Sequence, residues 1–339
     1  MVIFGAGASH DSIPSLYRPP HLPKSLEDGR PPLAADLFSS HETYGEHISH
    51  FPRCHLIVPY LRAIPADSSV EHVLETLQAE GASDPERKCQ LAAVRCYLQF
   101  LIYECERHWP PAAHRITNYV TLFDQFRRTN DEILIVTFNY DRLIEKALES
   151  LGVFITEMNG YISNSKIKLV KLHGSVNWAR DVETEIANVG ERNVWEVMNK
   201  LIDKAGDLRL TDRFRIVDSH PIGRIEKTPL IPAIAIPVET KTDFECPSSH
   251  LDYLRQMVSS VTKVLVVGWR GAERHFLKLL HEHGLRNVPA QIVADRKARA
   301  EETLERITAT GLKIIGDPCD EQGFTPYVVS RKAEQFFAS

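Results

Sequence analysis

The sequence predicts an α/β protein with a doubly wound, Rossmann-like parallel sheet and an inserted helical module. Short apolar runs alternate with helical patterns along the chain, as in βαβ units. Several of these runs are continuous rather than alternating, which is typical of strands buried on both faces. The distance between the first two runs is too long for a single crossover and indicates an insertion. Strands are expected at residues 2–4, 133–138, 169–172, 230–236, 263–267 and 290–294.

The elements between these strands set the expected domain boundaries. Six prolines between residues 11 and 32 predict an irregular loop. Helix signals then dominate 68–128: Ser68 and Glu71 have the spacing of a capping box, and Asp84-Pro85 is typical of a second helix start. We therefore expect a Rossmann-like, NAD-binding domain formed by 1–32 and 129–339. The helical module is expected at 33–128, and 180–228 is expected to be a charged insertion.

The helix expected after the second strand covers residues 141–148 and ends near Gly152, a typical carboxyl-terminal cap. The helix at the end of the module carries Leu91, Val94, Leu98 and Leu101 at helical spacing.

Bulk composition narrows the class of protein and its partners. The chain has 339 residues, 43% hydrophobic and 25% charged, which is ordinary for a globular protein. A net charge of -5 gives no electrostatic reason to expect nucleic acid as the main ligand. Apolar runs such as 264–267 are too short to span a bilayer, and no signal peptide is apparent. We expect a cytoplasmic protein with no membrane partner.

The cysteine pattern bears on metal binding. None of the six cysteines forms a C-x-x-C pair, so a zinc ribbon has no ligands in the sequence and no metal site is expected. Cys89, Cys96 and Cys105 lie in an apolar helical pattern, where they are expected to fill a core.

Three polar turns follow three of the expected strands. They are Gly5-Ala6-Gly7-Ala8-Ser9, Thr137-Phe138-Asn139-Tyr140-Asp141 and Lys171-Leu172-His173-Gly174-Ser175. Open α/β sheets bind ligands at the carboxyl ends of their strands, so these turns together point to a nucleotide site. Gly5 and Gly7 allow close backbone approach to a diphosphate, although a tight turn after a short strand explains them equally well.

The second and third turns carry the reactive groups. Asn139 offers amide donors and an acceptor for a ribose hydroxyl or a water, whereas Asn and Asp after a strand also commonly cap the next helix. His173 ends an apolar strand, and a neutral imidazole there can act as a general base, although most histidines are structural. A Gly beside it, Gly174, is expected to leave space for a ligand.

Two later strands end on further candidates. Gly268 follows the apolar run 264–267 and lets backbone approach a ligand. Asp295 follows 290–294, where a carboxylate suits ribose hydroxyls or the adenine end of a dinucleotide. Asp295 is equally suited to capping the helix that follows it.

In this order the pieces resemble the sirtuin superfamily of NAD-consuming enzymes, in particular its divergent bacterial sirtuin-like domains. Gly5 to Ser9 resembles the Gly-Ala-Gly-x-Ser phosphate loop of the family. Residues 13–18 resemble its Gly-Ile-Pro-x-Phe-Arg cofactor loop, with Ser12 in place of the Gly and Tyr17 in place of the Phe. Thr137 to Asp141 is similar to Thr-Gln-Asn-x-Asp, and His173-Gly174 to the catalytic His-Gly. The zinc-ribbon cysteines are absent, and Asp295 stands where deacetylases usually have Asn.

The resemblance implies NAD as the substrate and assigns roles to the matching residues. Asn139 would bind the nicotinamide ribose and a water, and His173 would activate that water or a ribose hydroxyl. Asp141 would orient the ribose or the nicotinamide, and Arg18 would contact the cofactor from its loop. The diphosphate would be held by Gly5, Ala6, Gly7 and Ser9.

The missing zinc module argues against peptide deacylation and favours hydrolysis of NAD itself, an activity that such domains use in anti-phage defence. The resemblance also implies a homo-oligomer and a possible partner ATPase or other defence protein. Two alternatives stay open: a regulatory subunit that binds NAD or ADP-ribose without turnover, and a protein deacylase.

Overall fold

The computed structural model describes most of the chain. The described residues are 1–12, 31–33, 37–38, 42–64, 68–81, 83–109, 117–128, 131–183, 193–218, 220–225, 228–238, 244–319 and 323–338. Most of the proline-containing loop expected at 11–32, and the cofactor loop 13–18 within it, therefore lies outside them.

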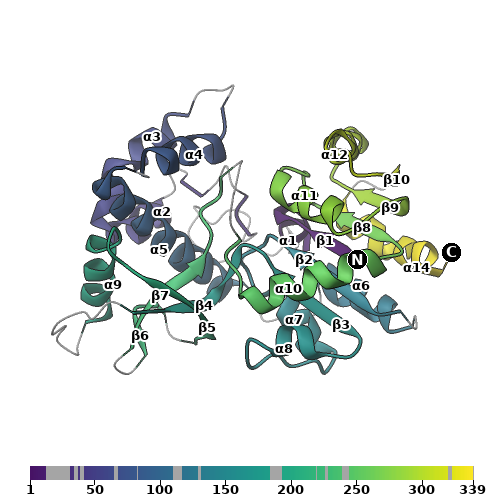
Figure 1. Ribbon diagram of the computed structural model, residues 1–339, viewed down its shortest axis with the longest axis horizontal. Helices are drawn as coiled ribbons and strands as arrows, with labels where there is room; N and C mark the ends of the chain where they lie inside the picture. The colour runs from purple at the N-terminus through teal and green to yellow at the C-terminus, as the bar shows by residue number, and fades with distance from the viewer. Residues whose placement is uncertain are drawn as a thin grey trace.

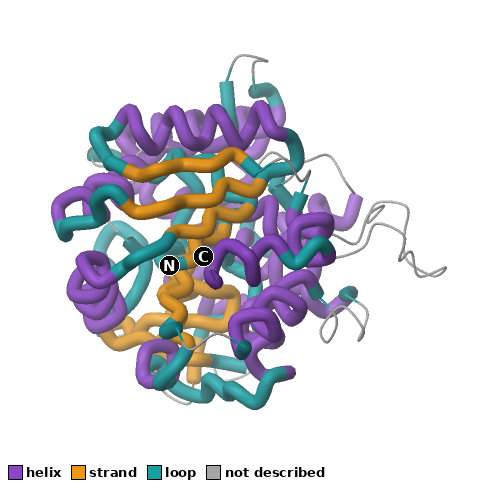
Figure 2. The backbone as a smooth tube through the Cα atoms, turned by 90° about the vertical axis from the view of Figure 1, so that its right-hand side faces the viewer, coloured by secondary structure: helices purple, strands orange, loops and turns teal. Residues whose placement is uncertain are grey.

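A six-stranded parallel sheet forms the larger half of the described structure, with helices on either side of it (Figures 1 and 2). Its strand order is β10-β9-β8-β1-β2-β3, and every neighbouring pair is parallel. This confirms the predicted Rossmann-like α/β fold. The strands are β1 (Val2–Phe4), β2 (Ile133–Thr137), β3 (Ile167–Lys171), β8 (Val264–Val267), β9 (Val288–Val293) and β10 (Ile314–Pro318).

The helices that belong to this half share one apolar core with the sheet. One of them, α6 (Asn118–Arg127), falls inside the segment expected to form the inserted module. Its Tyr119 and Phe123 nevertheless pack edge-on against Phe4 of β1. The others are α1 (Ala6–Ser12), α7 (Leu143–Ser150), α8 (Gly160–Ser163), α10 (Ser248–Met257), α11 (Arg274–Glu282), α12 (Lys297–Ala309), α13 (Phe324–Val329) and α14 (Lys332–Ala338), with a 3-10 turn at Val258–Ser260.

A second, antiparallel sheet lies beside the remaining helices, on the left of Figure 1. Its order is β5-β4-β7-β6, with β4 (Gly174–Val182), β5 (Leu210–Ile216), β6 (Arg224–Ile225) and β7 (Thr228–Ile234). The helices are α2 (Glu42–Ser49), α3 (Val58–Arg62), α4 (Val70–Gly81), α5 (Pro85–His108) and α9 (Val194–Asp203), with a 3-10 turn at Pro52–Leu56. These elements share a second core, so residues of 180–228 pack with the helical module.

The apolar run 230–236 was expected in the parallel sheet, and this expectation is wrong. The run belongs to β7 of the antiparallel sheet. It lacks alternation because both of its faces are covered: Leu230 and Ile234 join the core with α5, whereas Ile231 packs with Val197 and Leu201 of α9. A strand buried on both faces has the same sequence pattern in either kind of sheet.

The helix starts in the module agree in part with the sequence. Asp84 caps α5 by accepting a hydrogen bond from Glu86 N at 2.9 Å, with Pro85 in the first position, as expected. The cap of α4 is Ser69 rather than Ser68, because His72 N donates to the Ser69 hydroxyl at 3.0 Å. Cys89, Cys96 and Cys105 are buried free thiols of α5.

Candidate functional site

The expected site residues gather at one edge of the parallel sheet. The register pairs Phe4 with both Thr137 and Val267, and Thr137 with Lys171, so the carboxyl ends of these strands lie level. The residues that follow these ends are Gly5 after β1, Asn139 after β2, His173 after β3, Gly268 after β8 and Asp295 after β9.

The sheet reverses its direction of growth between β1 and β8. The chain builds outward from β1 through β2 to β3 on one side, and from β8 through β9 to β10 on the other. Ligands of open α/β sheets bind at such a switch point, outside the carboxyl ends of the strands. Gly5 and Gly268 are the residues at this point.

The loops after β1 and β8 touch through their backbones. Gly268 has φ +61°, and a Cβ there would lie 2.2 Å from the amide nitrogen of Ala8, so only glycine fits. Gly5 N donates to Val267 O, and Gly7 N donates to Gly268 O, both at 3.1 Å. These amides are therefore already bonded within the protein, which corrects the expectation that Gly5 and Gly7 face a diphosphate. Ala6 is the exposed residue of the turn.

Asn139 is held in a buried polar cluster beside the glycine turn. Its Nδ2 donates to Gly5 O at 3.0 Å, to the Ser9 hydroxyl at 2.9 Å and to the Tyr119 hydroxyl at 3.3 Å. Because a backbone carbonyl can only accept, the amide nitrogen must face Gly5. Its Oδ1 is buried and has no hydrogen-bond partner among the described residues. An unsatisfied buried acceptor is costly and is rare in native proteins unless a ligand or water completes it.

Asp141 combines capping with a place beside this cluster. Its Oδ1 accepts from Leu143 N at 3.0 Å at the start of α7, so the capping role left open by the sequence is realised here. Burial raises the pKa of this carboxyl, and the positive charge of Lys171 and a hydrogen bond from Ser9 oppose the rise. Ser9 therefore connects Asp141 with Asn139.

Lys171, which the sequence analysis did not single out, ties β3 to this turn. The side chain is fully buried, and its Nζ donates to Asp141 O at 2.5 Å and to Glu145 Oε1 at 2.8 Å. Tyr161 donates to the same Glu145 oxygen at 3.0 Å. The signal that could have found it is a lysine inside the apolar run Leu169 to Leu172, because a charge in a buried strand needs a partner.

Helix α5 also contacts the turn 139–142. Glu106, near the end of α5, is buried and accepts hydrogen bonds from Arg142 N and Nε, both at 2.7 Å. Burial raises the pKa of Glu106 despite the opposing Arg142 charge. The turn 139–142 is thus fixed by contacts from Gly5, α1, β3, α5 and α6.

His173 is buried at the end of β3 within an aromatic group. Its ring lies 4.9 Å from that of Phe138 and 6.2 Å from that of Tyr140, the two neighbours of Asn139 in the chain. Phe138 in turn stacks on Trp269 at 5.3 Å. Asn139 and His173 therefore contact different partners and are linked through the segment 138–140.

The glycine after His173 does not leave space for a ligand, contrary to the sequence expectation. Gly174 has φ +77°, and a Cβ there would lie 1.9 Å from the carbonyl oxygen of Ala233. The space on the Cβ side of Gly174 is thus filled by the backbone of β7, and Ala235 N donates to His173 O at 2.9 Å.

The remaining candidates are less closely connected. The Asp295 side chain is 55% exposed and pairs with Arg299 at 2.9 Å, one turn into α12. No contact places it in the Asn139 cluster within the described residues. Arg18 lies outside the described residues.

In the described part of the chain, no three His, Cys, Asp or Glu side chains come together as a metal site. Among these same residues, every helix is too short or too polar to cross a membrane.

Comparison with known proteins agrees with the resemblance over part of the chain. The SIR2-like domain family matches residues 133–205, which include Asn139, Asp141, Lys171 and His173. The comparison with curated proteins found no match.

Solved structures similar to this chain include complexes of Sir2 homologues. A Sir2 homologue mutant bound to ADP-ribose is 13% identical with a TM-score of 0.36, covering 92% of this chain and 93% of that chain. A triple mutant bound to 2'-O-acetyl ADP ribose is 14% identical with a TM-score of 0.31, covering 70% of this chain and 79% of that chain. Residues 133–205 of this chain are thus similar to the SIR2-like domain family.

Proposed function

We propose that the protein is an NAD+ glycohydrolase, which cleaves the bond between nicotinamide and ribose to give nicotinamide and ADP-ribose. The observation that carries the proposal is the buried Asn139 amide beside the switch point of the sheet. Its nitrogen is consumed by protein acceptors, and its Oδ1 has no partner among the described residues. A ribose hydroxyl or a water is the kind of donor that satisfies such an oxygen.

Cleavage of NAD+ needs no general acid to protonate the leaving group. Nicotinamide leaves a cationic pyridinium as a neutral base, so the leaving group needs no proton. A water oxygen forms a bond to the anomeric carbon as the bond from that carbon to nitrogen breaks. The proton lost from the water passes to a base, and one NAD+ and one water yield nicotinamide, ADP-ribose and a proton.

The residues divide this work as follows. Asn139 Oδ1 accepts from the ribose or positions the water, and His173 takes the proton from the water. Asp141 orients the ribose side through its connection with Ser9. The aromatic group of Phe138 and Trp269 next to His173 excludes bulk water from the ribose.

The diphosphate binds at the exposed edge of the glycine turn, at Ala6, because the Gly5 and Gly7 amides already donate to Val267 O and Gly268 O at the end of β8. Gly268 shapes that edge by its close approach to Ala8. Arg18 and Asp295 are proposed to contact the cofactor and its adenosine end, respectively.

We also propose that the enzyme depletes NAD in the cytoplasm during bacterial anti-phage defence. The support for this role is the motif resemblance of the Gly5, Asn139 and His173 turns. An NAD-depleting enzyme must be restrained until needed, and assembly into a homo-oligomer or with a partner ATPase provides such restraint. The helical module is the proposed contact surface.

The test is incubation of the purified chain with NAD+ over a range of protein concentrations, with chromatography of the products. Formation of nicotinamide and ADP-ribose supports the proposal, and a steep dependence on protein concentration supports control by assembly. Tight calorimetric binding of NAD+ with no product at any concentration would instead indicate a regulatory binding subunit. Turnover that requires an acetyl-lysine peptide would indicate a deacylase.

A further inference from the structure

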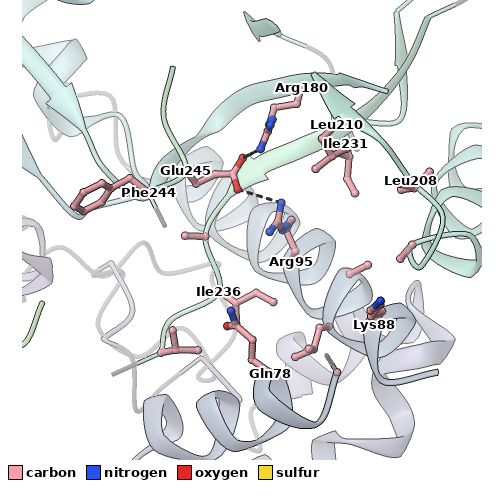
Figure 3. A pocket seen from close by; sticks show the side chains of 16 residues that line it. Gln78, Lys88, Arg95, Arg180, Leu208, Leu210, Ile231, Ile236, Phe244 and Glu245 are labelled. Carbon is pink, nitrogen blue, oxygen red and sulfur yellow. Dashed lines mark hydrogen bonds and ion pairs between the residues drawn. The ribbon is translucent and has the colours of Figure 1, made fainter. Parts of the chain in front are cut away.

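A cavity of the described structure lies away from the glycine turn. Its volume is about 600 Å³, and it opens between α4, α5 and the end of β7 (Figure 3). That volume is within the range of small-molecule sites. The walls are mostly aliphatic, with Leu91, Leu208, Leu210, Ile231, Ile236 and Val238 among them.

A cluster of charges lies in one wall of this cavity. Glu245 is placed between two arginines, with Arg180 Nη1 at 3.1 Å and Arg95 Nη1 at 3.3 Å from its carboxylate oxygens (Figure 3). Lys88 also lines the cavity, and its ammonium has no ion pair among the described residues. Three cations and one carboxylate leave a net charge of +2 facing the cavity.

The partly buried arginines keep capacity for a second anion. The Arg180 and Arg95 side chains are 20% and 22% exposed, whereas Glu245 is 10% exposed. Each guanidinium carries five N–H donors in a planar fork that fits carboxylate and phosphate oxygens. One carboxylate cannot use all the donors of two guanidinium groups.

The cavity is separate from the candidate NAD site but is connected to it by backbone hydrogen bonds. Its lining includes none of the glycine turn, Asn139 or His173. Two of its lining residues are bonded to the segment before β4: Glu245 N donates to Leu172 O at 3.0 Å, and Ala235 N donates to His173 O at 2.9 Å.

We propose that this cavity binds a small organic anion, a carboxylate or phosphate monoester carried on an aliphatic body. The anionic group pairs with Arg95, Arg180 and Lys88, and the aliphatic body lies against the leucine and isoleucine walls. Charge and shape both favour this class: the net positive charge disfavours a cation, and the apolar lining disfavours a fully polar anion such as free phosphate.

The experiment is calorimetric titration of the full chain with octanoate, octyl phosphate and octanol. We expect at least one of the two anions to bind, and the preference between them identifies carboxylate or phosphate as the natural group. Octanol has the same chain without the charge, and we expect it to bind at least about tenfold more weakly than that anion.

Three variants locate the binding. Arg95→Met should lower the affinity for the anion by about tenfold or more, while Glu245 keeps its ion pair with Arg180. Lys88→Met, which breaks no ion pair among the described residues, should lower this affinity severalfold. The control is Arg87→Met on the same helix, where Arg87 pairs with Glu80 at 2.9 Å outside the cavity lining, and the affinity should stay unchanged.

The proposal fails if neither anion binds, if octanol binds as tightly as the anions, or if both Arg95→Met and Lys88→Met bind like the unmodified chain. Because the readout is binding alone, its outcome is independent of whether the protein hydrolyses NAD+.

Discussion

The amide nitrogen of Asn139 lies 2.9 Å from the hydroxyl oxygen of Ser9, so a turn after β2 and the helix after β1 meet across 130 positions of the chain. The same nitrogen also donates to Gly5 O at 3.0 Å. These contacts fix the orientation of the amide and leave its oxygen as the group available to a ligand.

Asn139→Asp should lower the stability of the protein by about 1–3 kcal/mol, the usual cost of leaving a buried polar group unsatisfied. The substitution replaces the NH2 donor by an acceptor facing the carbonyl of Gly5. The free energy of unfolding in urea measures this effect. An Asp variant as stable as the unmodified protein would show that the amide nitrogen does not face Gly5.

Gly268→Ala should destabilise the protein more than Gly311→Ala. Both glycines have positive φ, but a Cβ at Gly268 would lie 2.2 Å from Ala8 N, whereas nothing lies within 4 Å at Gly311. The left-handed conformation alone costs roughly 1–2 kcal/mol, and the clash adds to this at Gly268 only. Thermal unfolding of the two variants gives the comparison, and equal losses would contradict the close packing of the two loops.

Lys171→Met should cost about 3–5 kcal/mol, because it leaves Glu145 largely buried without its cation. The double variant Lys171→Met/Glu145→Gln should recover part of the loss, since no uncompensated charge remains. Lys168→Met is the matched control on the same strand. Its partner Glu132 is 63% exposed, so a loss of about 1 kcal/mol or less is expected.

Chemical denaturation of the unmodified protein and these three variants measures their free energies of unfolding. The interpretation of Lys171 as the tie between β3 and the Asn139 turn would be wrong if Lys171→Met were no more harmful than Lys168→Met.

Glu106 should give the folded state a pH dependence of opposite sign to that of an ordinary paired carboxylate. Its folded pKa is raised above the ordinary value of 4.5 by burial. Between these two pKa values the folded protein holds more of the proton than the unfolded chain, so the contribution of Glu106 to stability falls as pH rises. The stability difference between the unmodified protein and Glu106→Gln should therefore decrease from pH 4.5 upward.

Urea unfolding of both proteins at several pH values checks this sign. A difference that grows with rising pH would mean that the Arg142 charge outweighs burial at Glu106.

Much of the parallel sheet could be predicted because its central strands are buried on both faces and therefore contain uninterrupted apolar runs. Ile133 to Val136 and Val264 to Val267 are examples. Strand β10 was missed, since Ile314 to Pro318 lies at the sheet edge and is only partly buried. Which of two sheets holds the run 230–236 depends on contacts with α5 and α9 that no local pattern contains.

The candidate site was predictable in its turns but not in its internal contacts. The Gly5, Asn139 and His173 turns follow apolar strands, so their common edge follows from the topology. The use of Gly7 N by Gly268 O and the buried bond from Lys171 to Glu145 join segments far apart in sequence. Such pairings depend on the final packing, which spacing along the chain does not encode.

The central claim is that His173 activates water for attack on NAD+ at a site that Asn139 completes. The most direct measurement is the rate of nicotinamide release by the His173→Ala protein, together with its calorimetric affinity for NAD+. We predict a rate about a hundredfold to ten-thousandfold lower, as for loss of a general base, with the affinity nearly unchanged. Release of nicotinamide by His173→Ala at the rate of the unmodified protein would contradict the account.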